Sequence, residues 1–171
     1  MKTLKRVLFL AVLLSFTAGL YAQNLKIGHI DSNEIMNLMP ERNKVEEDLV
    51  QFEQQLENEL RTMANEYQNK VAEYQNNLAT MSNLIRQARE KEITDLQMRI
   101  QDFQQSADQE YNEKRIELLT PLIDKIRNAI EEVGTENGYA YILDAATGVL
   151  LHVGADAHDL TPQVKEKLGI R

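Results

Sequence analysis

The sequence has one long stretch without helix-breaking residues, since positions 41–133 contain no glycine and a single proline, Pro121. Glycine and proline most often mark helix ends, so this stretch favours helices longer than those of compact domains. Its apolar residues recur every three or four positions, and Gln, Asn, Glu and Lys fill the positions between them. Because such a stripe is narrow, as in a coiled-coil seam, we expect paired helices rather than helices around a wide core.

The apolar register of this stretch is lost near its middle. Before that point Val45, Leu56 and their equivalents stand 11 residues apart, a repeat that predicts a nearly straight or gently right-handed helix. Ser82 and Asn83 then favour a helix cap and a turn. We therefore predict an antiparallel helical hairpin whose tip lies near residues 80–85 and whose first arm is about 60 Å long.

The second arm contains Pro121, which we expect to kink the helix because its ring removes one backbone hydrogen bond. Aromatic residues lie on the stripes of both arms. We interpret them as seam residues, with the alternative that some face a cavity: Phe52, Tyr67, Tyr74, Phe103 and Tyr111.

Short β-type segments flank the helical stretch. Residues 25–30 predict a strand, and Asp31 predicts an N-cap with Glu34 as its return partner in a capping box. Residues 139–144 and 149–153 predict two further strands joined as a hairpin. Thr161 and Pro162 predict the N-cap and first position of a last helix that ends at Gly169, and Asn137-Gly138 predicts a left-handed helix stop.

Three short strands are marginally stable alone. We therefore expect an α+β chain in which a small β-body, residues 23–40 and 134–171, is completed by oligomerisation, while residues 41–133 form a long coiled-coil hairpin arm. The apolar body residues expected to take part in association are Ile27, Ile30, Tyr139, Tyr141, Leu143, Val149, Leu151 and Val153.

The N-terminal segment 1–22 reads as a secretory signal peptide. Three basic residues precede the short apolar run 7–16, and small residues precede a plausible cut after Ala22. The alternative is an N-terminal membrane anchor, for which the apolar run is short. Loss of three basic residues from 19 Lys and Arg, against 27 Asp and Glu, changes the net charge from −8 to −11.

Composition argues against several classes of function. An acidic chain lacks the clustered Lys and Arg that bind nucleic acid. Without cysteine there is no thiol nucleophile or thiolate metal site, and no phosphate-binding glycine loop occurs. A metal site is not expected, because the candidate zinc ligands His29, Asp31, Asp144 and His152 lack the usual spacing. The three histidines and the scattered carboxylates also offer no pairing of a nucleophile with a base, so we expect no cofactor and no enzymatic activity.

The order of these segments resembles the Skp/OmpH family of periplasmic chaperones. The similarity covers residues 23–171, and its specific parts are KIGHID, MPE, GYAYILDA and DLTPQVKEKLG on either side of the glycine-free hairpin. The resemblance implies a homotrimer in which trimerisation completes the β-body. It also implies three arms around a cavity that holds unfolded outer-membrane β-barrel proteins in the periplasm without ATP. The alternative function is an exported coiled-coil spacer or adaptor of the cell envelope.

Charge is where this chain departs from the resemblance, because members of that family are often strongly basic. Residues 41–66 contain eight acidic and three basic residues, so we do not carry over a lipopolysaccharide site. The tip is mildly basic, and its residues are candidates for contact with clients or with a membrane surface. The alternatives are packing of the turn and a solvated helix face with local pairs such as Arg86–Glu90. The candidate residues are Met81, Leu84, Ile85, Arg86, Arg89 and Lys91.

Overall fold

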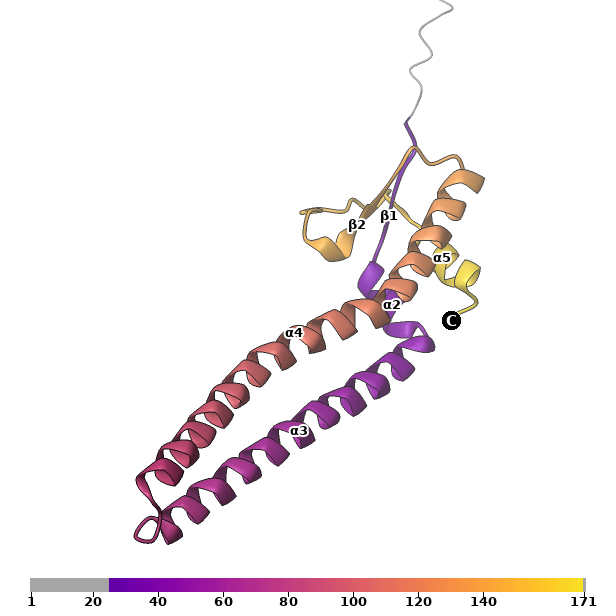
Figure 1. The fold of residues 1–171 in the computed structure, drawn as a ribbon. Coiled ribbons are helices and arrows are strands. Elements are labelled where there is room, and N and C mark those ends of the chain that lie inside the picture. The colour runs from indigo at the N-terminus through magenta and orange to yellow at the C-terminus, as the bar shows by residue number, and fades with distance from the viewer. Residues whose placement is uncertain (1–24, 171) are drawn as a thin grey trace, which may run out of the picture.

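A computed structural model describes residues 25–170. The expected signal peptide, residues 1–22, and its cut after Ala22 lie outside the described residues. The chain forms a long two-helix arm attached to a small body of sheet and short helices (Figure 1). In order, the elements are β1 (Ile27–Ile30), α2 (Ser32–Leu38), α3 (Glu41–Asn77), α4 (Asn83–Glu136), β2 (Tyr141–Asp144), the 3-10 turn η2 (Ala145–Thr147), β3 (His158–Asp159) and α5 (Thr161–Leu168).

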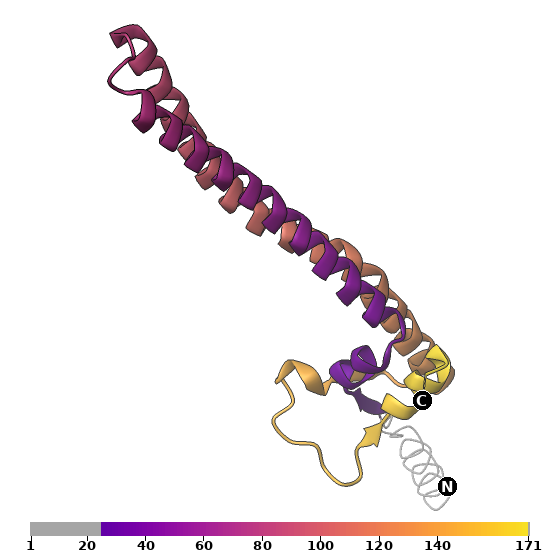
Figure 2. The same cartoon turned by 90° about the horizontal axis from the view of Figure 1, so that it is seen from below.

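Helices α3 and α4 run antiparallel and side by side, as Figures 1 and 2 both show. The chain reverses between Asn77 and Asn83, where the Ser82 hydroxyl caps α4 by accepting a hydrogen bond from the Ile85 N–H at 3.4 Å. The predicted hairpin and its tip are therefore observed. Helix α4 continues through Pro121, and Figure 1 shows that it changes direction between the part beside α3 and the part in the body.

The main core lies in the body, where β1, α2, the last turns of α4, and α5 meet. Ile35 and Val164 are fully buried at its centre. The other buried members of this cluster are Ile30, Met39, Ile126, Ala129, Val133 and Leu160. A smaller cluster of Val45, Leu49 and Leu122 lies where the arm joins the body. Most seam residues farther along the arm are only half-buried, because two helices alone cannot enclose a core.

The sheet is parallel, with strand order β2-β1-β3. The predicted hairpin of residues 139–144 and 149–153 is therefore wrong. Residues 149–153 form an exposed loop, and the third strand is His158–Asp159 on the other side of β1. The physical reason is that η2 and the left-handed Gly148 (φ 72°) direct the chain away from β2. The chain then loops widely before β3 (Figure 2).

Side-chain caps connect the segments of the body. Asp31 caps α2 as predicted, accepting from the Glu34 N–H at 2.9 Å. The return half of the predicted box is wrong, because the Asp31 N–H donates to the Thr161 hydroxyl at 3.0 Å while Glu34 pairs with Lys165. The predicted N-cap at Thr161 is also wrong, because Thr161 is the first residue of α5 and Leu160 occupies the N-cap position. Helices α4 and α5 end at the left-handed Gly138 and Gly169, as predicted.

Candidate functional site

The face of the sheet opposite the helices is apolar and exposed. Register pairs Ile27 with Tyr141 and His29 with Leu143, and the three apolar members of this set are all exposed. Gly28 and Ile30 alternate with them and face the buried side, as the pleat of a strand requires. This open face lies on the body beside the root of the arm.

The loop after η2 adds further apolar side chains. Leu151 is 95% exposed and Val149 is 78% exposed. Val153 and Leu150 border the same small cavity as Ile27 and Leu143, which places this loop next to the open face of the sheet. Contiguous exposed apolar residues of this kind mark interaction sites in soluble proteins. We name the set of Ile27, Tyr141, Leu143, Val149, Leu151 and Val153 the body patch.

Two of the predicted association residues lie elsewhere. Ile30 is 2% exposed and belongs to the core of the single chain. Tyr139 is half-buried, its hydroxyl lies 3.0 Å from His158 Nδ1, and Lys26 Nζ lies 4.1 Å from the centre of its ring. Both residues therefore support the body from within.

All three histidines of the chain line one cavity of about 150 Å³ between the sheet and the loop: His29, His152 and His158. Across residues 25–170, no three His, Asp or Glu side chains are close enough to hold a metal ion. Asp31 and Asp144, the carboxylates considered with these histidines as metal ligands, act as helix caps instead. Asp144 Oδ2 accepts from the Ser32 hydroxyl at 2.6 Å, and its Oδ1 accepts from the Ala146 N–H at 3.0 Å.

At the tip of the arm, two apolar side chains point into solvent. Leu84 is 78% exposed and Ile85 is half exposed, whereas Met81 is partly buried. The expected Arg86–Glu90 pair is absent from the described ion pairs, since Glu90 accepts a hydrogen bond from the Tyr74 hydroxyl. That bond raises the pKa of Tyr74.

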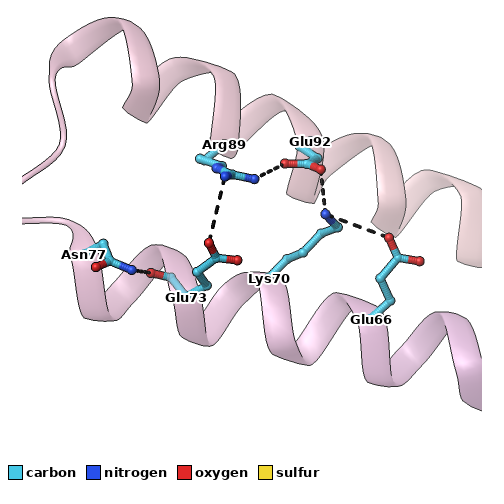
Figure 3. Close-up of polar contacts among 6 residues, drawn as sticks. All are labelled: Glu66, Lys70, Glu73, Asn77, Arg89 and Glu92. Carbon is cyan, nitrogen blue, oxygen red and sulfur yellow. Dashed lines mark hydrogen bonds and ion pairs between the residues drawn. The ribbon is translucent and has the colours of Figure 1, made fainter.

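The two remaining tip cations are engaged in ion pairs. Arg89 binds Glu92 at 2.9 Å and lies 3.8 Å from Glu73 of the facing helix, while Lys70 binds Glu92 at 2.6 Å (Figure 3). Hydrogen bonds from Lys70 and then Arg89 hold the pKa of Glu92 below its ordinary value. Lys91 pairs with Asp95 along α4. Arg89 and Glu92 therefore belong to a clasp between α3 and α4.

Between the root and the tip, the facing helices leave a cleft of about 460 Å³. The sequence stripe passed through this point without a break, so the cleft was not predicted. One signal was available, because Ala107 places a small side chain in a seam of larger ones. The cleft also contains Phe103 and Tyr111, two of the aromatic residues interpreted above as seam residues.

No helix within residues 25–170 combines the length and apolarity needed to cross a bilayer. Exposed large apolar side chains lie in the body patch and at the arm tip, and also along the arm, as at Val50, Met98 and Ile116.

Comparison with known proteins agrees with this architecture. The sequence model of the outer membrane protein (OmpH-like) family matches residues 26–168. No curated protein matches the chain. Among solved structures, the fold is similar to an OmpH-like protein from Caulobacter crescentus CB15 described as a candidate outer membrane chaperone, with a TM-score of 0.69 and 17% identity. That match covers 87% of this chain and 90% of the other. The chain therefore belongs to the OmpH-like outer membrane protein family.

Proposed function

We propose that this protein is an ATP-independent holdase chaperone of the periplasm that binds unfolded outer-membrane β-barrel proteins and prevents their aggregation. The observation that carries the proposal is the combination of a long solvated arm with an exposed apolar patch on the body at its root. The patch provides a surface for association with other copies. The arms of an assembled particle would then surround a space that a client chain can occupy.

A homotrimer is the assembly that we propose, as the family resemblance implies. The body patch includes Leu151 and Val149, whose exposure is costly in a free monomer and whose burial favours association. Strands β2 and β3 each pair on one side only among the described residues, so their outer edges are open to another chain. Both features support completion of the body by copies of the same chain.

We place client contact on the arms. Leu84 and Ile85 expose apolar surface at the tip, and the polar faces of α3 and α4 offer many weak contacts along the length of the arm. Weak, numerous contacts hold an unfolded chain without trapping it. Arg86, Met81 and Lys91 border the same tip, and Arg89 is the tip residue least free to act, because Glu73 and Glu92 already engage it.

Export to the periplasm is the location that we propose. The basic, apolar and small residues of segment 1–22 have the order of a cleavable signal peptide, and the family is one of periplasmic chaperones. A holdase in that compartment works without a nucleotide supply, in keeping with a sequence that has no phosphate-binding glycine loop.

The direct test is aggregation of a urea-unfolded outer-membrane β-barrel protein after dilution, followed by light scattering. We expect equimolar assembled protein to suppress the rise in scattering. Leu151→Glu should abolish suppression because it places a charge in the body patch, while Ile116→Glu, at an exposed position on α4, should leave it intact. An unchanged rise in scattering with the wild-type protein would contradict the holdase function. A stable folded partner bound at the tips would favour the envelope spacer instead.

A further inference from the structure

The mid-arm cleft is an opening in a seam that is better packed at both ends. Its apolar lining includes Leu56 and Leu60 from α3 and Phe103, Ala107 and Tyr111 from α4. Toward the root the seam contains the buried Val45, Leu49 and Leu122, and toward the tip it contains the buried Leu96. The methyl group of Ala107 is too small to fill the space that its larger neighbours fill elsewhere.

Three carboxylates border the cleft, and all three are exposed: Glu53, Glu57 and Asp108. None of them has a Lys or Arg within ion-pair distance among the described residues. Some carboxylates elsewhere on the arm are paired, as in Lys44–Asp48 near the root and Lys91–Asp95 near the tip. The cleft therefore combines apolar walls with negative charge that the chain itself does not neutralise.

The size of the cleft suits a short piece of polypeptide. Pockets that bind small ligands and peptide side chains have volumes of about 300–1,000 Å³ and are mostly apolar with a few polar groups. The lining residues remain partly exposed along the arm. The cleft is therefore open to solvent, and a client polypeptide can lie across it without passing its end through an enclosed channel. Like charges repel an acidic segment, and the carboxylates favour a Lys or Arg placed beside apolar residues.

We propose that this cleft is a binding subsite for an extended segment of unfolded polypeptide that carries a lysine or arginine next to apolar side chains. The inference rests on the proposed function and assigns part of client recognition to a particular place on each arm. Apolar side chains enter between α3 and α4 against Phe103 and Tyr111. The basic side chain stays at the border, where Glu53 and Glu57 lie one helical turn apart.

The test uses the full mature chain and two peptides of equal length with the same alternating apolar residues. One peptide carries Lys at the polar positions and the other carries Glu, and each contains one photo-activatable leucine. We expect the Lys peptide to form adducts within residues 53–60 and 103–112, and the Glu peptide to form few. Equal labelling by both peptides, or adducts spread evenly along the arm, would overturn the proposal.

Charge variants give an independent measure of affinity by fluorescence anisotropy. Glu53→Gln with Glu57→Gln should weaken binding of the Lys peptide about fivefold, the size expected for two exposed ion pairs. Glu59→Gln with Glu110→Gln removes the same charge at exposed positions outside the cleft and should change affinity less than about twofold. Equal effects of the two pairs would assign binding to net charge and overturn the cleft as a site.

Two further outcomes separate this inference from the proposed function. If the protein suppresses client aggregation but the Lys peptide does not label the cleft, the subsite is wrong and the holdase function stands. If a photo-reactive group on Cys at position 107, introduced as Ala107→Cys into this cysteine-free chain, cross-links two copies without peptide, a second copy fills the cleft. That result would also overturn the proposal. Ser106→Cys, at an exposed position outside the lining, is the matched control.

Discussion

Truncation of Ile35 is the perturbation that best tests where the stability of this chain resides. Ile35 lies on α2 and is 0% exposed within the main core. Ile35→Ala removes three carbon atoms, which costs about 2.4 kcal/mol at about 0.8 kcal/mol for each methylene. A residual cavity of about 60 Å³ adds about 1.4 kcal/mol. The predicted loss in the free energy of unfolding of the body is therefore about 4 kcal/mol, within the range of buried Ile-to-Ala substitutions.

Hydrogen exchange with mass spectrometry is the suitable assay, because it reports the body and the arm separately. A loss of about 4 kcal/mol should accelerate exchange through global opening of the body about a thousandfold. Protein concentration must be held constant, since association with other copies also contributes to stability. The control is Ile116→Ala on α4, where the side chain is 62% exposed and the expected change is within about 0.5 kcal/mol. A change below tenfold for Ile35→Ala, or equal changes for the two variants, would refute this reasoning.

Four more predictions concern other parts of the chain. Asp144→Ala removes the carboxylate that accepts hydrogen bonds from the Ser32 hydroxyl and from two backbone N–H groups. The free energy of unfolding, measured in urea, should fall by about 1–3 kcal/mol; a fall under about 0.5 kcal/mol would contradict this. Gly28→Ala places a Cβ 2.6 Å from Leu160 Cδ1 and should speed exchange in α5, so unchanged exchange would count against the packing described. The pKa of Glu92 is lowered from 4.5, so its ion pairs stabilise the tip fully above that pH and are lost as the pH falls through the lowered value. Spin labels on α3 and α4 near the tip should show broader distances in acid, and Glu92→Gln should show them already at pH 7; identical profiles would refute the clasp. Pro121→Ala restores a backbone N–H within α4 and should stiffen the arm, which would narrow the spread of arm-tip distances in solution scattering. An unchanged spread would show that Pro121 does not make the arm flexible.

Local chemistry made several helix boundaries predictable from the sequence. Ser82 acts as a cap, and Gly138 and Gly169 adopt the left-handed conformation. These roles depend on neighbouring residues alone, so the local sequence is sufficient to predict them. The long hairpin was predictable for a related reason. An apolar stripe with no glycine, continued over many turns, leaves few other structures open to the chain.

Pairing between strands was not predictable in the same way. The β-type residues at 149–153, after a turn, predicted a strand, yet pairing depends on which distant segment hydrogen-bonds to each edge of β1. The observed partner, His158–Asp159, has only two residues and shows no periodicity to read. Its position follows from α5, because Leu160 and Thr161 dock against β1 and α2 and bring the preceding residues to the sheet.

Among the candidate surfaces, too, features set by local sequence were predictable and features set by long-range packing were not. Tyr141 and Leu143 are exposed on one face of the sheet, while Ile30, predicted in the same set, is buried on the opposite face. The mid-arm cleft depends on which residues of α3 face Ala107, a long-range register that no local pattern specifies. The clasp at Glu92 likewise joins residues of two helices, and the sequence alone offered only pairs within one helix.

Native mass, measured by light scattering with and without an unfolded outer-membrane β-barrel protein, tests the central claim most directly. We predict a particle of three chains that gains the mass of one client and stays soluble. A monomer that gains no mass while the client precipitates would contradict the account.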